Sequence, residues 1–294
     1  MQSSRRSLIV SIVFFSPALI IMLFFFVMPI LSSFYYSLFE WDILSSDSKY
    51  VGLQNYIDLF SSRHLLTAVR NTVVYAVLVA FFNNFFGLLL ALGLDNNFKT
   101  KKVLRTMFFI PSLISLVISG YTWTFLYHPE YGVPKFLSDN FHINIFNQDW
   151  LGDPQIVIYS IAFVTIWQYA GYYMVIYLTG LQGVPIDLYE ASIIDGANLW
   201  RRFWSVTFPM IAPAITVGIV TATIGGLKVF DQVFVMTRGG PGFSSETLTT
   251  LLVTQTFFLS KAGYGVTISV ILFILVFTFS IFQLNFLRKR EDVF

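Results

Sequence analysis

The sequence predicts an all-α, polytopic membrane protein with about six transmembrane helices. Of its 294 residues, 56% are hydrophobic, only 12% are charged, and Phe alone occurs 33 times. A soluble chain of this length would need a more charged surface. Six apolar runs also reach the roughly 20 residues with which a helix crosses a bilayer. These runs are 8–30, 72–94, 105–127, 155–180, 208–230 and 265–287.

The first run is predicted to be a retained span rather than a cleaved signal peptide. Arg5 and Arg6 precede it, as they would in a signal peptide. However, its apolar stretch is too long for a signal-peptide core, and no small-x-small cleavage site follows Pro29. We therefore expect 1–66 to form an N-terminal transmembrane helix followed by an extracytoplasmic segment.

Basic residues cluster beside alternate connections, and this bias predicts the orientation. The basic residues of one set of connections and ends are Arg5, Arg6, Lys99, Lys101, Lys102, Arg105, Arg201, Arg202, Arg288, Lys289 and Arg290. On the other side, basic residues are spread over longer loops that contain more acids. Both termini and the segment 182–208 are therefore expected in the cytoplasm.

Several functional classes are not indicated. The net charge is +2 with no exposed run of Lys and Arg, so nucleic acid is not an expected partner. Cysteine is absent, which excludes disulfides and thiolate metal sites, and the three histidines lack metal-ligand spacing. The run Arg238-Gly-Gly-Pro-Gly is not a phosphate loop, because no Lys-Ser/Thr follows it. No nucleophile–base or acid-pair arrangement lies in a span, so we expect neither an enzyme nor a cofactor or metal site.

The segment 182–208 is the most informative part of the chain, because it is too long for a simple reversal of direction. Pro185 is expected to stop the fourth helix, and Asp187 with Glu190 resembles a helix N-cap and its capping-box partner. Gly196 suits a left-handed helix end, and Asn198 can cap a second short helix. The segment is thus predicted to form a helix-turn-helix on which another protein docks.

Apolar residues recur at helical spacing in both halves of this segment. The first face comprises Leu188, Ala191 and Ile194, and the second comprises Leu199, Phe203 and Val206. Pro209 and Pro213 are expected to open or kink the fifth span, since a missing N–H costs least near a helix start.

The segment also carries a recognisable motif. Glu190-Ala-Ser, Asp195-Gly-Ala and then Phe203, Val206 and Pro209 resemble the EAA loop of binding-protein-dependent ABC importer permeases. The chain departs from the family pattern at three positions: Ser192 replaces Ala, Val206 replaces Ile, and Phe208 replaces Leu. Residues 167–185 and 228–248 are similar to the corresponding blocks of sugar-type permeases, so the resemblance covers essentially the whole chain.

The resemblance is closest to the first of the two permeases in carbohydrate and glycerol-3-phosphate importers. It implies a type I ABC importer transmembrane domain at 67–290, with a cytoplasmic coupling loop at 182–208, in a bacterial inner membrane. It also implies four kinds of partner: a second permease in a heterodimer, two ATPase subunits, an extracytoplasmic solute-binding protein, and a sugar or polyol. The ATPase-coupling residues that it implies are Glu190, Ala191, Ser192, Asp195, Gly196, Ala197, Arg201 and Phe203.

Two of these roles have simpler alternatives. Glu190 can contact the ATPase or only cap its own helix. Arg201 and Arg202 can pair with acids of the partner or only anchor at anionic lipid headgroups.

Candidate pathway residues lie in the spans. Lys228 and Asp231 are the only ionisable residues near the interior of a span, where a charge costs at least about 2.5 kcal/mol. At i, i+3 spacing they are expected to pair on one helix face, or to line a cavity or gate. Asn83 and Asn84 are interpreted as hydrogen-bonding between helices.

Aromatic faces and one amide add the chemistry that stacks on and hydrogen-bonds a sugar. These candidates are Trp123, Trp167, Gln168, Tyr169 and Tyr172. In so aromatic a chain, the alternative for each ring is packing or contact with lipid.

The leading alternative function is a self-sufficient secondary transporter or channel. Such carriers usually hold acids within several spans and often an inverted repeat. This chain offers one Lys and Asp pair and no visible repeat. Glycerol-3-phosphate stays open as the solute of an ABC permease.

Overall fold

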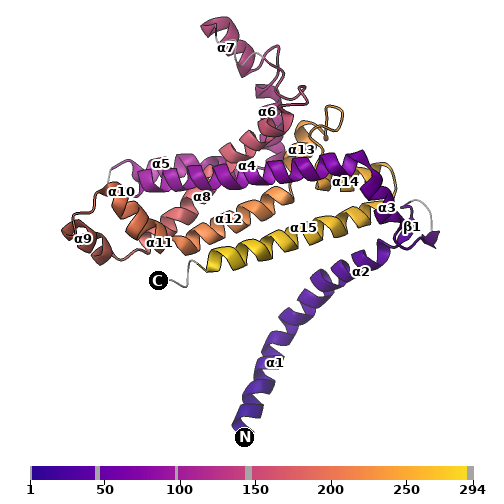
Figure 1. The fold of residues 1–294 in the computed structure, drawn as a ribbon, viewed down its shortest axis with the longest axis horizontal. Helices are drawn as coiled ribbons and strands as arrows, with labels where there is room; N and C mark the ends of the chain where they lie inside the picture. The colour runs from indigo at the N-terminus through magenta and orange to yellow at the C-terminus, as the bar shows by residue number, and fades with distance from the viewer. Residues whose placement is uncertain (1, 44–46, 97–98, 143–147, 290–294) are drawn as a thin grey trace. The chain divides into compact units, whose positions relative to one another are not determined.

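The computed structural model describes residues 2–43, 47–96, 99–142 and 148–289. Arg290 of the basic C-terminal cluster lies outside them. The chain divides into two compact units (Figure 1). Unit 1 comprises Met1–Ser62 and Leu252–Ile271, and unit 2 comprises Arg63–Leu251 and Leu272–Phe294.

Unit 1 begins with a long apolar helix. Three consecutive helical segments form it: α1 (Gln2–Met22), the π-helical turn η1 (Leu23–Val27) and α2 (Met28–Tyr36). Its part Ile12–Tyr36 is long and apolar enough to cross a membrane. The predicted span ended too early at residue 30. Pro29 lies at the start of α2, which follows directly on the π-helical turn η1, and the helix continues through it to Tyr36.

Besides the Ala262–Ile271 part of the last helix, unit 1 contains short elements. They are β1 (Phe39–Trp41), β2 (Ser48–Tyr50), α3 (Gln54–Ser61) and the π-helical turn η5 (Thr254–Phe258). The two strands pair antiparallel, and Glu40 faces Lys49 in their register. The amide of Asn55 on α3 donates to the carbonyls of Ser37 and Phe39 at 2.9 and 3.0 Å, which fixes the exit of the long helix.

Unit 2 is built on long helices. They are α4 (Arg63–Leu94), α8 (Val157–Gln182), α12 (Ala212–Leu227) and the Leu272–Arg288 part of α15 (Ala262–Arg288). α4 packs against both α8 and α12, and the core lies between them. Gln283 of α15 donates to Thr223 of α12 at 3.0 Å. The second span is α4, and it begins at Arg63 rather than at the predicted residue 72.

The third predicted span is broken. α5 (Lys101–Phe109) continues as the 3₁₀ turn η2 (Ile110–Leu113), and α6 (Leu116–Leu126) follows after a bend of 95°. The prediction of a single straight helix over 105–127 is wrong, because Ile114 takes an extended conformation (φ −72°, ψ 136°).

The fifth span is also bent. α10 (Leu199–Arg202), the π-helical turn η4 (Phe203–Thr207) and α11 (Phe208–Met210) lead into α12 through a bend of 70°. Pro209 and Pro213 lie in the first turns of α11 and α12, which confirms the predicted kink. This helical run starts at Leu199, not at residue 208.

Four shorter helices complete unit 2. They are α7 (Val133–Phe141), α9 (Ile186–Ile194), α13 (Asp231–Met236) and α14 (Leu248–Val253), the last of which crosses the unit boundary. By length and composition, the described chain has four helices able to cross a membrane, or up to six if each bent pair is one span. The all-α, polytopic fold class is confirmed.

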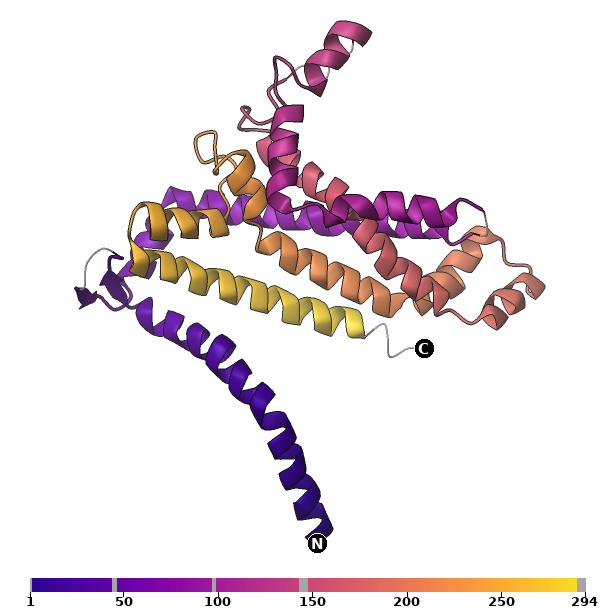
Figure 2. The ribbon, with the colours of Figure 1, turned by 180° about the vertical axis from the view of Figure 1, so that it is seen from behind.

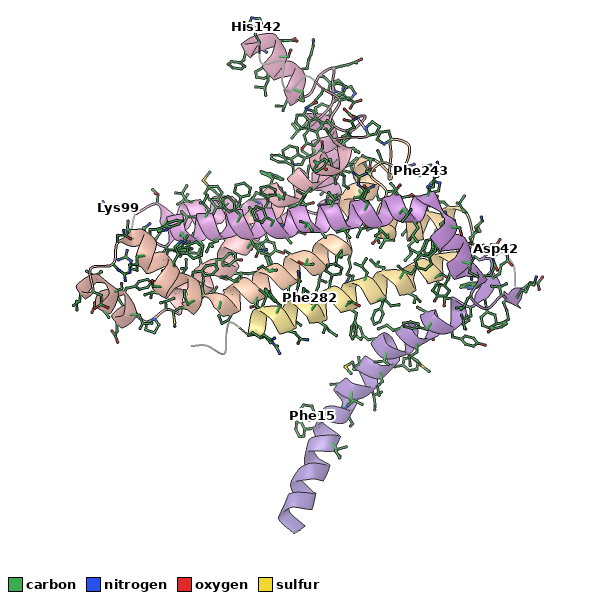
Figure 3. All side chains as sticks on the ribbon, in the orientation of Figure 1. Phe15, Asp42, Lys99, His142, Phe243 and Phe282 are labelled. Atoms are coloured by element: carbon green, nitrogen blue, oxygen red, sulfur yellow. The ribbon has the colours of Figure 1, made fainter. Side chains whose placement is uncertain are left out.

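Two labelled side chains mark the ends of unit 2 (Figure 3). Lys99 lies where α4 connects to α5, and Phe243 lies beyond α13, near the start of α4. Both ribbon views place α9 and α10 at the Lys99 end (Figures 1 and 2).

Candidate functional site

A cavity of about 430 Å³ lies inside unit 2, between α4, α8, α12 and the start of α13. Its polar lining includes Asn83, Tyr169, Tyr172, Thr221, Lys228 and Asp231. On α4 the lining residues Tyr75, Val79 and Asn83 follow one another every four residues, as one face of a helix requires. Asn83 is 20 residues from the start of this 32-residue helix, so the cavity lies well inside the span.

Lys228 and Asp231 do not form the predicted pair on one helix face. Lys228 caps the end of α12, Asp231 begins α13, and Phe230 between them is non-helical (φ −133°, ψ −60°). No ion pair joins the two side chains in the described part of the chain. Both line the cavity instead, so one cation and one anion face the same space.

Asn83 and Asn84 differ in role. The amide of Asn84 donates to the carbonyl of Ala80, and its oxygen accepts from the hydroxyl of Tyr177, each at 2.6 Å. The predicted interhelical bond is thus confirmed for Asn84. Asn83 is 1% exposed, lines the cavity, and its amide oxygen has no hydrogen-bond partner among the described residues. Tyr75, Val79 and Asn83 follow one another every four residues in the sequence. This spacing is the signal that could have singled out Asn83.

The other predicted pathway residues lie apart from the cavity. Gln168 is fully buried, and its amide is engaged within the protein. The rings of Trp123 and Trp167 contact each other with centroids 5.3 Å apart, and neither lines the cavity. Of the predicted aromatic residues, Tyr169 and Tyr172 are the two that face it.

The 182–208 loop has the expected helix-turn-helix form, with two corrections. α8 already ends at Gln182, so Pro185 does not stop it but precedes the first residue of α9. Asp187 lies in the first turn of α9 and makes no capping bond, because the helix starts at Ile186. Gly196 has a φ of +72°, and the Asn198 side chain accepts from the N–H of Arg201 at 2.8 Å. The left-handed turn and the second cap are confirmed.

The loop exposes a large apolar surface. Ile194 is 86%, Leu199 76% and Trp200 71% exposed, and Ile186 and Ile193 add to them. Glu190, Ala191, Asp195 and Arg201 are exposed beside these residues, whereas Ala197 and Phe203 are partly buried.

Contacts within the loop hold its two helices together. Ser192 is buried, its hydroxyl donates to the carbonyl of Tyr189 at 2.7 Å, and its own carbonyl accepts from Ala197 at 2.9 Å. The hydroxyls of Tyr189 and Thr207 share a hydrogen bond of 3.3 Å. The guanidinium of Arg202 lies 5.8 Å from the Tyr189 ring, a cation–π distance. The loop can therefore move as one body with the start of the fifth span.

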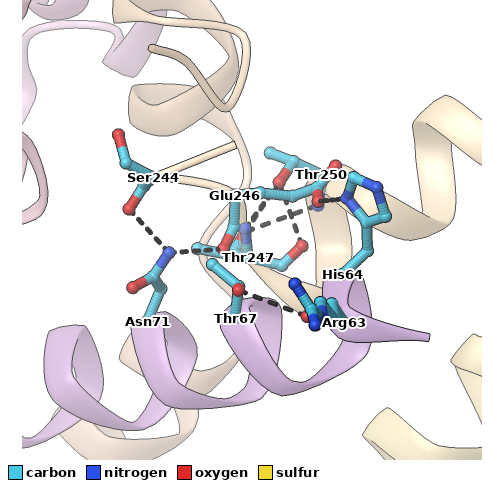
Figure 4. Close-up of polar contacts among 8 residues, drawn as sticks. All are labelled: Arg63, His64, Thr67, Asn71, Ser244, Glu246, Thr247 and Thr250. Atoms are coloured by element: carbon cyan, nitrogen blue, oxygen red, sulfur yellow. Dashed lines mark hydrogen bonds and ion pairs between the residues drawn. The ribbon is translucent and has the colours of Figure 1, made fainter. Parts of the chain in front are cut away.

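At the Phe243 end, residues 244–248 are bound to the start of α4 (Figure 4). Asn71 donates to the carbonyls of Ser244 and Glu246 at 2.8 and 3.0 Å. The N–H of Leu248 donates to Thr72 at 2.9 Å. His64 and Glu246 form an ion-pair contact of 3.5 Å. Burial raises the pKa of the Glu246 carboxyl, and His64 opposes this rise.

The raised pKa of Glu246 predicts a pH-dependent stability. Its neutral form suits the buried site, so its contribution is complete below the ordinary Glu pKa and is lost as pH rises through the raised value. Glu246→Gln keeps the side-chain shape but cannot ionise. The difference in melting temperature between Glu246→Gln and wild type should therefore shift in favour of the variant as pH rises above the ordinary Glu range.

Glu40→Gln removes a carboxylate from an exposed glutamate outside this contact and provides the matched control. His64→Gln should move the transition to higher pH, because His64 lowers the pKa of Glu246. A pH-independent difference between wild type and Glu246→Gln would contradict this account.

The fold and the two features of unit 2 define a class of protein. Apolar helices surround a cavity that polar side chains enter, and a loop with an exposed apolar surface lies at one end. This is the architecture of a membrane permease that works with a separate subunit. The family model described as "Binding-protein-dependent transport system inner membrane component" matches residues 83–291, and the chain belongs to this family.

Relatives match along the whole chain. A probable ABC transporter permease protein, YurN of Bacillus subtilis, is 33% identical over 97% of this chain and 98% of its own length. The trehalose/maltose transport system permease protein MalF of Thermococcus litoralis is also 33% identical, over 94% of this chain and 92% of its own. A crystal structure of a bacterial alginate ABC transporter, in complex with an alginate-pentasaccharide-bound periplasmic protein, contains a chain of the same fold. It has a TM-score of 0.82 and 21% identity, covering 98% of this chain and 96% of that one.

Proposed function

We propose that this chain is the transmembrane subunit of an ATP-driven importer of neutral carbohydrates and forms half of the translocation pathway. The cavity in unit 2 is the observation that carries the proposal. Its one cation and one anion leave it without net charge, and Tyr169 and Tyr172 offer aromatic faces. An amide and two charged groups beside aromatic rings suit a solute with many hydroxyls.

The 182–208 loop is proposed to dock on an ATPase subunit. Its exposed apolar side chains need cover from a partner, since patches of this kind mark interaction sites. Glu190, Ala191, Asp195, Gly196 and Arg201 would lie at that contact. Ser192, Ala197 and Phe203 would act by holding the loop in shape.

The remaining partners follow from the family. They are a second permease, two ATPase subunits and an extracytoplasmic binding protein. The chain itself would hydrolyse nothing. The Lys99 end, with its Lys and Arg residues, would face the cytoplasm together with both termini, in keeping with the positive-inside bias.

The alternatives fit the cavity less well. A glycerol-3-phosphate permease would need a net positive site, but Asp231 faces Lys228 across the same space. A self-sufficient carrier would leave the exposed apolar loop without a purpose.

Reconstitution tests the proposal directly. Purified chain alone in liposomes should take up neither maltose nor trehalose, with or without a proton gradient. Uptake should require the second permease, the ATPase and ATP together, and loaded binding protein should stimulate ATP hydrolysis severalfold. Glycerol-3-phosphate serves as the anionic comparison and should not stimulate it.

Two results would overturn the proposal. Sugar uptake by the isolated chain would indicate a self-sufficient transporter. Stimulation by glycerol-3-phosphate, but by no neutral sugar, would refute the assignment of the solute class.

A further inference from the structure

Two buried amides and one backbone carbonyl in unit 2 form a chain of hydrogen bonds. Gln168 on α8 is fully buried, and Gln232 on α13 is 3% exposed. The amide nitrogen of Gln168 donates to the carbonyl of Ile114 at 2.7 Å. The amide oxygen of Gln168 accepts from the amide nitrogen of Gln232 at 3.2 Å. We call this chain of bonds the amide relay.

One end of the amide relay lies at the break in the third span, and the other lies at the start of α13, just past the end of α12. Ile114 is the extended residue at the 95° bend between η2 and α6, so its carbonyl leaves the helical ladder. Gln232 is the second residue of α13. This helix begins at Asp231, directly after the non-helical Phe230. α8 runs unbroken between them, and Gln168 lies within it.

Close packing leaves Gln168 little freedom to choose other partners. Gly171, one turn further along α8, lies directly against the backbone of α5. A Cβ at this position would overlap the carbonyl oxygen of Phe108. The bend of the third span is therefore held tightly against α8 on the face that presents Gln168.

The amide relay also adjoins the cavity. Gln232 and its neighbour Asp231 line the cavity, as does Leu116 beyond the bend. Tyr169, next to Gln168 in sequence, lines it as well. A movement of α13 or of the bend would change the cavity wall and would stretch or break one amide bond, leaving a buried polar group unpaired.

We propose that Gln168 and Gln232 are positioning residues that make the bend of the third span and the start of α13 move together when the cavity changes access. The inference rests on the proposed transport function. Helical breaks are the places where such a pathway can change shape, because the backbone there is free of the helical ladder. The amide relay gives the bend of the third span and the start of α13 a single set of partners, so neither can rearrange alone.

The test uses the assembled transporter and the absence of cysteine in this chain. Thr221→Cys places one reporter thiol in the cavity wall. Its labelling by a membrane-impermeant maleimide is compared between nucleotide-free and ATP-plus-vanadate states. Uptake and ATP hydrolysis are measured with maltose and trehalose as probes. Gln168→Leu and Gln232→Leu are each placed in this background.

We expect both substitutions to lower sugar uptake about tenfold while ATP hydrolysis stays within about threefold. The state dependence of reporter labelling should largely disappear in both. The double variant should be no worse than either single one, because the residues act through one chain of bonds. Gln232→Leu keeps the Gln168–Ile114 bond, so the test stays decisive if Gln168→Leu accumulates poorly.

Gln283→Leu is the matched control. Gln283 also donates an interhelical bond, to Thr223 at 3.0 Å, but neither residue lies at a helix break. A merely structural role for such amides would affect all three variants alike. Equal effects in Gln283→Leu, or unchanged uptake and labelling in Gln232→Leu, would refute the positioning role. Absence of any sugar uptake by the assembled transporter that carries the unsubstituted chain would instead refute the proposed function.

Discussion

Gly196→Val should abolish most sugar uptake by the assembled transporter while the chain still inserts and assembles. Gly196 has a φ of +72°, in the left-handed region, where a side chain costs roughly 1–2 kcal/mol and a β-branched one more. A Cβ there would meet nothing within 4 Å, so the effect would come from the backbone and not from crowding inside the chain. We expect uptake to fall at least tenfold with ATP hydrolysis largely retained. Paired uptake and ATPase assays in proteoliposomes would measure this uncoupling.

Two further substitutions separate backbone strain from surface contact. Asn tolerates the left-handed region, so Gly196→Asn should keep uptake within about threefold. Gly196→Asp tolerates it similarly but projects a charge into the space where a partner would dock, and it should lose uptake. Wild-type uptake in both Gly196→Val and Gly196→Asp would exclude a coupling role for this turn.

Asp231→Ala should lower sugar uptake by about one to two orders of magnitude. The Asp231 carboxylate lines the cavity, and no ion pair with Lys228 occupies it in the described structure. A hydrogen bond to a charged group contributes about 1.5–3 kcal/mol, so its loss corresponds to roughly a 10- to 150-fold change. Initial uptake rates at saturating binding protein would show the effect, because that condition bypasses capture from solution.

Asp231→Asn keeps one acceptor oxygen and should have an intermediate effect. Exposed Asp58 supplies the matched control, and Asp58→Asn should transport normally. Unchanged uptake in Asp231→Ala, with the protein monodisperse and assembled, would remove Asp231 from the pathway.

The local features of the 182–208 loop were predictable from sequence, because short-range geometry decides them. A glycine in a left-handed turn, an asparagine cap and two prolines near helix starts each act within a few residues. The capping prediction for Asp187 was wrong because the helix starts two residues earlier than a cap at Asp187 requires.

The cavity residues were only partly predictable. Tyr169, Tyr172, Lys228 and Asp231 were singled out by residue type and do line the cavity. Asn83 was predicted to hydrogen-bond between helices, whereas the structure places it in the cavity lining with no partner for its amide oxygen among the described residues. Gln168 has the chemistry of a sugar ligand but lies fully buried, where the bend of the third span uses its amide.

The sequence by itself determined the apolar helical class, the approximate spans and the helix-turn-helix between the fourth and fifth. Hydrophobic length and local backbone preference act along the chain and do not depend on distant partners. Only the tertiary structure decided where the third and fifth spans break and which side chains meet inside them. Those outcomes depend on contacts between residues far apart in sequence, such as Gln168 with Ile114 and Gln232, and they exist only once the helices have packed.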